Sequence, residues 1–146
     1  MLGSFAFLNG LLTIGIVAML AMATGTPSLF PSLGPTAFLL FTTPMLPAAC
    51  RRNTVDGHLI GVIAGYLSLV LFGLTDAAPT IVEGVSGGRV GAAALSLALT
   101  SGFMVWLQRP HPPAGATTLI ISFGILREPW QLCVLMVAVV LMVVQG

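Results

Sequence analysis

Charged side chains are scarce in this sequence. Asp, Glu, Lys and Arg together make up 6% of its 146 residues, whereas hydrophobic residues make up 57%. A soluble domain of this size could not cover its surface with so few charges, so the composition excludes that class and predicts a polytopic helical membrane protein. The formal net charge of +1 gives no sign of a nucleic-acid partner, and none is expected.

Cysteine is nearly absent, and the apolar segments contain no acidic residue. Cys50 and Cys133 lie far apart, without a metal-binding spacing such as CxxC, so we interpret both as small apolar side chains and expect no metal or other cofactor. Two isolated histidines, His58 and His111, with no intramembrane acid make a poor active site. We therefore expect no enzymatic activity.

Six apolar segments follow one another, and four of them are long enough for a helix to cross a hydrocarbon core of ~30 Å. The N-terminal segment lacks a basic n-region and is followed by others, so we interpret it as a transmembrane helix rather than a secretory signal. The long segments cover about residues 4–24, 58–74, 90–107 and 130–144, and the short ones about residues 34–45 and 111–124. We expect an all-α membrane fold in which the short segments are broken spans; alternatively, they are re-entrant or surface helices that leave four full spans.

Each short segment is introduced by prolines. One stretch reads His111-Pro112-Pro113-Ala114-Gly115-Ala116-Thr117, and the other reads Pro31-Ser32-Leu33-Gly34-Pro35-Thr36. Placed with their prolines in register, the two stretches align glycine with glycine and threonine with threonine. This pattern predicts pseudo-repeats of about 4–75 and 85–146 within a single transmembrane domain spanning residues 1–146.

Three crossings in each half would invert the second repeat relative to the first, which is a 3+3 inverted architecture. An extended approach over residues 25–33 would let one short helix begin at Gly34, and an extended Pro112-Pro113 entry would introduce the other. The first N–H groups of both helices would then be free and would meet near the bilayer midplane. Free N–H groups and positive helix-dipole ends favour a small anion.

The residues expected to bind this anion come from both stretches and are Ser32, Gly34, Thr36, His111, Gly115, Thr117 and Thr118. His111 and His58 are also candidates for a proton relay, because imidazole changes charge near neutral pH. Alternatively, His111 caps the proline turn and His58 is a structural interface residue. The hydroxyl groups could likewise bond their own helix carbonyls instead of lining a path.

Small residues predict two faces for close helix packing. One contains Gly61 and Gly65 and is a candidate surface for a homo-oligomer; the other contains Ala94, Ala98 and Gly102. The arginines predict the topology by the positive-inside rule. Arg51, Arg52 and Arg109 are expected on the cytoplasmic side with both termini, and Arg89 and Arg127 on the other side.

The string from His111 to Thr117, together with Pro31-Ser32-Leu33-Gly34, Asn53 and Gly57-His58, resembles the HPP family of integral membrane proteins. That resemblance implies a membrane-embedded helical fold, usually described with four transmembrane helices. Some family members from photosynthetic organisms are associated with nitrite transport, so the resemblance also implies nitrite as the transported anion.

These observations lead to one expected function and one alternative. We expect a transporter or channel for a small inorganic anion, nitrite in the first place, that spans the inner (plasma) membrane of a bacterial cell several times. The alternative is a non-transporting interaction or assembly subunit, whose small-residue faces would pack against partner helices.

Overall fold

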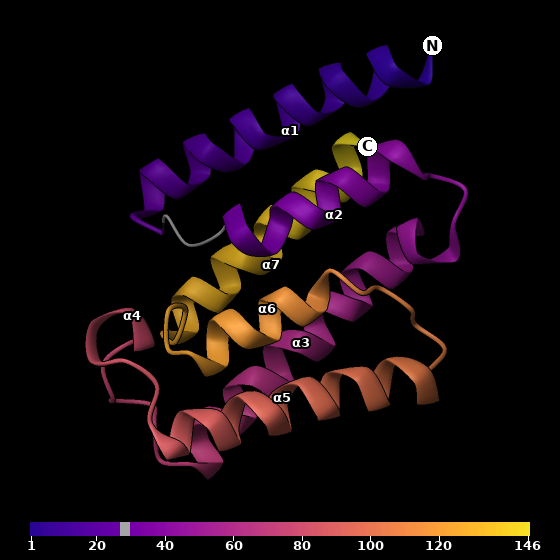
Figure 1. Cartoon of the computed structure of the whole chain (residues 1–146). Helices are drawn as coiled ribbons and strands as arrows, with labels where there is room; N and C mark the ends of the chain where they lie inside the picture. Colours follow the sequence, from indigo (N-terminus) through magenta and orange to yellow (C-terminus); the bar gives the residue numbers. More distant parts are fainter. Residues whose placement is uncertain (27–29) are drawn as a thin grey trace.

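Helices provide all the regular structure in residues 1–26 and 30–146, which are the residues that the computed structural model describes (Figure 1). The all-α fold class is therefore confirmed. The helices are α1 (Leu2–Thr24), α2 (Phe30–Thr42), the 3-10 helix η2 (Pro47–Ala49), α3 (Arg51–Leu71), α4 (Thr80–Glu83), α5 (Gly87–Trp106), α6 (Ala114–Ser122) and α7 (Pro129–Gln145). Residues 27–29, part of the expected extended approach, lie outside the described residues.

The six larger helices run side by side and alternate in direction along the chain (Figure 1). In the described part of the chain, α1, α3 and α5 are long and apolar enough to cross a membrane, and α7 is a shorter apolar helix. At 13 and 9 residues, α2 and α6 are only about 20 Å and 14 Å long, too short to cross alone. The chain is thus a multi-pass membrane protein, while the count of six segments and the inverted repeat stay predictions.

The glycine stripe of α3 explains why α6 packs so closely against it. A Cβ atom at Gly61 would lie 2.9 Å from the carbonyl oxygen of Ala114, and one at Gly65 would lie 2.9 Å from the Cβ of Ile121. The predicted close packing at Gly61 and Gly65 is therefore confirmed, but its partner is α6 of the same chain. This face is not available to a second copy, and the expected homo-oligomer stays a prediction without an assigned surface.

The buried face of α5 differs from the predicted one. Ala94 and Ala98 are exposed, while the buried positions of the helix are Arg89, Ala92, Ser96, Thr100 and Met104. Packing within this chain therefore uses another face of α5, and close packing of the Ala94 and Ala98 face against a further helix stays a prediction. Ser96 and Thr100 can face the protein because each hydroxyl donates to a carbonyl of its own helix, Ala93 and Ser96 respectively.

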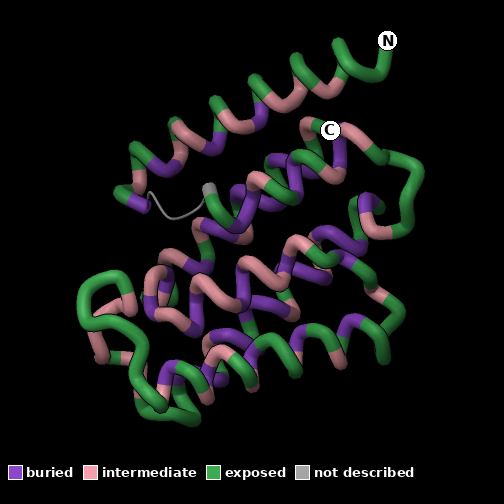
Figure 2. The backbone as a smooth tube through the Cα atoms, viewed as in Figure 1, coloured by how far each residue is buried: buried purple, intermediate pink, exposed green. Residues whose placement is uncertain are grey.

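Burial is concentrated on α2, α3, α6 and α7, whereas α1 is exposed along most of its length (Figure 2). The apolar core includes Leu33, Leu69, Ile121 and Leu135, each 0% exposed. The end of α7 is joined to α1, where the amide of Gln145 donates to Asn9 over 2.8 Å. The exposed apolar side chains of α1 suit a lipid environment.

The arginines gather at the two ends of the long helices. At one end, Arg52 and Arg109 both approach the carboxylate of Asp56, over 3.7 Å and 3.2 Å. At the other end, Arg89 and Arg127 both donate to the carbonyl of Ala77. The two groups are those expected from the positive-inside rule, although which end is cytoplasmic stays a prediction.

Candidate functional site

The helix α2 begins earlier than expected and places two predicted site residues one turn apart. It starts at Phe30 rather than Gly34, so Thr36 lies inside the helix and not at its N-terminus. The prediction failed because residues 30–33, expected to be extended, are helical, so Pro35 lies inside the helix. Proline there removes the bond to the carbonyl of residue 31, and its ring crowds that carbonyl. Ser32 and Thr36 consequently share one face.

The entry to α6 is a tight turn rather than an extended segment. Pro113 has φ −56° and ψ −24°, which is helical backbone. The N–H groups of Ala114, Gly115 and Ala116 donate to the carbonyls of the three residues before the helix, over 3.0, 2.9 and 3.1 Å. The predicted free N–H groups are therefore absent here, because the proline turn itself supplies acceptors. An anion at this helix end would depend on side chains and on the helix dipole.

Five side chains form a buried hydroxyl–imidazole cluster. They come from α2, α3, α6 and the turn of residues 111–113 that precedes α6, which we call the proline turn. Each is 0% exposed. The members are Ser32, Thr36, His58, Thr117 and His111. Since side chains on different helices are brought together by packing alone, this cluster is a property of the tertiary structure.

His58 lies at the centre of the cluster. Its Nδ1 is 2.7 Å from the Oγ1 of Thr117, and its Nε2 is 2.8 Å from the Oγ1 of Thr36. The Nε2 of His111 lies 3.3 Å from the Nε2 of His58 and 3.4 Å from the Thr36 hydroxyl. Thr117 donates in turn to the Oγ of Ser32 over 3.2 Å. Four of these contacts involve an imidazole ring, so the two rings carry most of the network.

His111 is held in place from two sides. Its Nδ1 donates to the carbonyl of Ala48 in η2 over 2.8 Å. Gly57 lies against the ring, because a Cβ at that position would be 2.6 Å from the Cβ of His111. Asn53 fixes η2 by donating to the carbonyl of Pro47 over 2.9 Å. The proline turn thus packs against the N-terminal part of α3 and against η2.

The cluster is polar but contains no charged partner. Among the hydrogen bonds of the described residues, none links it to an acidic or basic side chain. Asp56, two residues before His58, pairs instead with Arg109 and Arg52. Residues 1–26 and 30–146 also contain no group of three His, Cys, Asp or Glu that could hold a metal ion. The groups that this cluster can offer to a ligand are therefore hydroxyl and imidazole groups.

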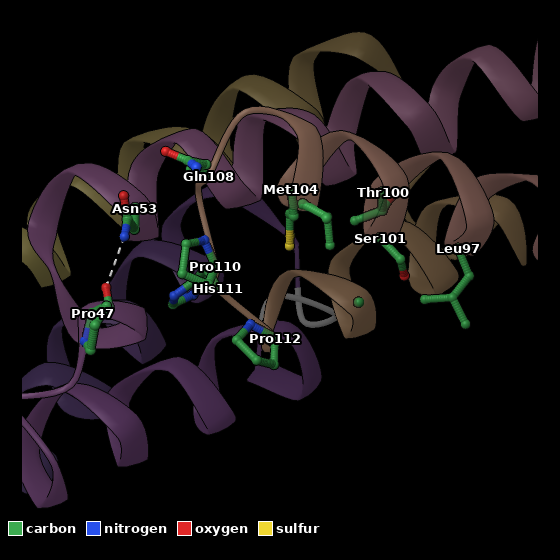
Figure 3. Close-up of a pocket in the computed structure, with 12 residues that line it drawn as sticks. Pro47, Asn53, Leu97, Thr100, Ser101, Met104, Gln108, Pro110, His111 and Pro112 are labelled. Atoms are coloured by element: carbon green, nitrogen blue, oxygen red, sulfur yellow. Dashed lines mark hydrogen bonds between the residues drawn. The ribbon is translucent and has the colours of Figure 1, made fainter.

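A cavity of ≈ 660 Å³ borders His111 on the side of α5. Figure 3 shows Thr100, Ser101 and Met104 of α5 on one side of it, with His111 and Asn53 on the other. Cavities of several hundred Å³ with a few convergent polar groups are typical ligand sites. The cavity has room for a small solute next to His111, whose side chain is itself 0% exposed.

The remaining predicted site residues lie near the cluster without joining its hydrogen bonds. Gly115 lines the cavity, and Gly34 lines a separate groove with Pro112 and Ala116. Thr118 is buried against α3, and its Oγ1 has no hydrogen-bond partner among the described residues. That these residues bind substrate stays a prediction.

Several residues of the site were not expected from sequence. They are the carbonyl of Ala48, the close contact of Gly57 with His111, and the cavity residues Thr100, Ser101 and Gln108. One signal was present, since Gly57, Gly61 and Gly65 recur at every fourth position and mark one face of α3. The backbone carbonyl has no sequence signal at all.

Comparison with known proteins places the chain in a family. The family described as "HPP, transmembrane region" matches residues 3–146. Two transmembrane proteins of Dictyostelium discoideum are similar to this chain. One is 29% identical over 103 residues, which cover 70% of this chain and 32% of that protein. The other is 29% identical over 120 residues, which cover 80% of this chain and 35% of that protein.

The chain thus spans about a third of the length of these curated relatives, whose names say only that they are transmembrane proteins. No solved structure matches. The match over residues 3–146 covers essentially the whole sequence and includes both proline-led stretches. This protein therefore belongs to the HPP family of transmembrane proteins.

Proposed function

We propose that this protein is a transporter or channel for a small inorganic anion, and that nitrite is the leading candidate. The observation that carries the proposal is the hydroxyl–imidazole cluster, two histidines and three hydroxyl side chains at 0% exposure inside an apolar helical bundle. Ionisable residues at membrane depth are costly, and by default they indicate a pathway for substrate or protons. The cavity beside His111 has room for a small solute next to this buried cluster.

The chemistry of the cluster favours an anion over a cation. A cation site would need carboxylates or several converging carbonyl oxygens, and no acidic side chain bonds to the cluster among the described residues. Hydroxyl and imidazole groups can donate hydrogen bonds, and a protonated imidazole adds a positive charge. The N-terminal end of α6, with its positive dipole end, lies at the same place.

We also propose that the two halves of the inverted 3+3 repeat each contribute one threonine to the site. The aligned threonines of the two proline-led stretches, Thr36 and Thr117, bond to the two opposite ring nitrogens of His58. The antiparallel course of α2 and α6 in Figure 1 agrees with inversion. In this proposal the protein lies in the inner (plasma) membrane of a bacterial cell and acts without enzymatic chemistry.

Thr117→Val tests the proposal, because valine keeps the shape of threonine but removes the hydroxyl between His58 and Ser32. Loss of one buried hydrogen-bond partner is worth about 1–3 kcal/mol, so anion influx should fall about 5- to 150-fold. The measurement is nitrite influx into liposomes that contain the purified protein, against empty liposomes. Thr117→Ser, which retains a hydroxyl, should recover most of the influx.

Equal influx for the wild-type protein and Thr117→Val would remove the cluster from the transport path. If nitrite, nitrate, formate and chloride all fail to enter faster than into empty liposomes, the transporter proposal is wrong. Copurification of a membrane protein partner in that case would support the interaction-subunit alternative. Cys133→Ser, an exposed position on α7, is the control for handling and reconstitution.

A further inference from the structure

We propose that His58 and His111 bind one excess proton between them, shared by their facing Nε2 atoms, and that this proton is the counter-charge of the transported anion. The sharing of the proton rests on hydrogen-bond geometry alone. Its coupling to an anion rests on the proposed function above. The predicted result is movement of one proton with each monovalent anion, so that transport carries no net charge.

The Ala48 carbonyl determines which nitrogen of His111 carries hydrogen. A carbonyl oxygen only accepts hydrogen bonds, and it lies 2.8 Å from Nδ1. The hydrogen of a neutral His111 is therefore on Nδ1. Its Nε2 then has a lone pair and no hydrogen.

The same assignment holds for His58. The hydroxyl of Thr117 has a single hydrogen, and this hydrogen is donated to the Oγ of Ser32. Since Oγ1 of Thr117 lies 2.7 Å from Nδ1 of His58, the imidazole must be the donor in that contact. A neutral His58 thus also presents a lone pair at Nε2.

The two lone pairs face each other with too few hydrogens between them. The Nε2 atoms lie 3.3 Å apart, and within residues 1–26 and 30–146 the only other polar group hydrogen-bonded to either of them is the Thr36 hydroxyl, at 2.8 Å and 3.4 Å. One hydroxyl hydrogen can satisfy only one of two acceptors. A single added proton completes the set, because it gives an N–H group that one ring donates to the other.

Charged groups on the neighbouring elements do not replace this proton. The sequences of α2, η2 and α6 contain no charged residue. On α3, Asp56 and Arg52 pair with each other, and Asp56 pairs with Arg109 at the end of the bundle. On α5, Arg89 donates to carbonyl groups at the opposite end. A protonated pair is therefore a cation of single charge, without a carboxylate in contact.

An uncompensated cation inside an apolar bundle is unfavourable, so it favours an anion beside it. The cavity bordered by His111 is where such an anion has room. Binding of the proton and the anion then assist each other by the same free energy, as linkage requires. The only bond that changes is N–H: a proton from water on one side adds to an Nε2 lone pair and leaves to water on the other side.

Nuclear magnetic resonance of the chain of residues 1–146 in lipid nanodiscs tests the shared proton without any transport. The chain has two histidines, so histidine labelled with the heavy nitrogen isotope, and a purification tag free of histidine, give signals from this cluster only. We expect both Nδ1 atoms to carry hydrogen throughout a pH titration. We also expect uptake of one proton by the pair, with both Nε2 signals shifting together.

Two results would overturn the shared proton. One is a neutral pair in which His58 carries its hydrogen on Nε2, because that tautomer satisfies both lone pairs without an added proton. The other is independent titration of the two rings. Addition of nitrite should raise the pH at which the proton is released, and an unchanged release would overturn the coupling.

His111→Asn gives the matched variant. The asparagine amide can still donate to the Ala48 carbonyl, but it has no acceptor in the position of Nε2. We expect the stimulation of nitrite influx by an inward proton gradient to fall about 10- to 100-fold, the loss of one charge-assisted hydrogen bond. The control is Arg51→Gln, at an exposed position at the start of α3.

The outcomes separate this inference from the proposed function. Proton sharing in the resonance experiment with no anion influx would contradict the proposed function and leave the shared proton standing. Anion influx that is independent of the gradient in both wild type and His111→Asn would contradict the coupling and leave anion transport standing.

Discussion

Gly57→Ala is expected to remove anion influx almost completely. The added Cβ would lie 2.6 Å from the Cβ of His111, which is closer than real Cβ atoms approach, and 3.3 Å from its Cγ. His111 has to move away from both Ala48 and His58, and loss of these two buried hydrogen bonds corresponds to a fall in influx on the order of 100-fold. Overpacking should also lower the free energy of unfolding by about 1–3 kcal/mol.

The measurements for Gly57→Ala are nitrite influx in liposomes and thermal unfolding in detergent. Gly15→Ala is the control, because a Cβ at Gly15 of α1 would meet nothing within 4 Å. Alanine is favoured over glycine inside a helix by about 1 kcal/mol, so the control should be neutral or slightly stabilised. Wild-type influx in Gly57→Ala would show that the position of His111 does not matter for transport.

Arg89→Met is expected to cause the largest loss of stability. The Arg89 side chain is 2% exposed, and it donates to the carbonyls of Ser122, Ala77 and Ala78 over 3.0, 3.1 and 2.8 Å. Methionine has similar bulk but no donor, so these acceptors lose partners at about 1–3 kcal/mol each. A positive charge is also lost at the C-terminal end of α6. We expect the free energy of unfolding to fall by about 3 kcal/mol or more.

Detergent-induced unfolding, followed by circular dichroism, measures this loss. Arg51→Met is the matched control, because Arg51 is exposed at the start of α3 and should tolerate the change. Equal stability of the two variants would mean that water or Arg127, which also donates to Ala77, replaces Arg89. Transport by any folded fraction should persist, since Arg89 lies at the opposite end of α5 from His111.

Predictions from local sequence features, namely apolar segments, prolines and charges, were most reliable for the bounds of the long helices. The predicted 90–107 segment is observed as Gly87–Trp106 and the 130–144 segment as Pro129–Gln145. They failed where prolines and charges were read as loop signals. The helix α3 begins at Arg51 rather than near His58, which places Asn53 and Gly57 on the helix. At the start of α3 a tertiary contact accompanies the longer helix, since Asn53 donates to the carbonyl of Pro47 in η2, and tertiary contacts can outweigh a local preference.

The residue types of the site could be found from sequence, but not their partners. Ser32, Thr36, His111 and Thr117 stand out as polar residues in proline-led apolar stretches. The predicted convergence of free backbone N–H groups was wrong, because the turn before α6 satisfies them internally. What converges instead is a set of side chains, and the distances between them depend on how α2, α3 and α6 pack.

The sequence by itself determined that this is an all-helical membrane protein, because scarce charge and long apolar segments leave no other stable arrangement in lipid. It also determined that two short apolar helices follow proline-led stretches, although not where each helix begins. Only the tertiary structure decided that His58 and His111 meet Nε2 to Nε2 at 3.3 Å. The physical reason is that this contact depends on close packing of α6 at the glycines of α3 and on one backbone carbonyl of η2, and neither is encoded in a local pattern.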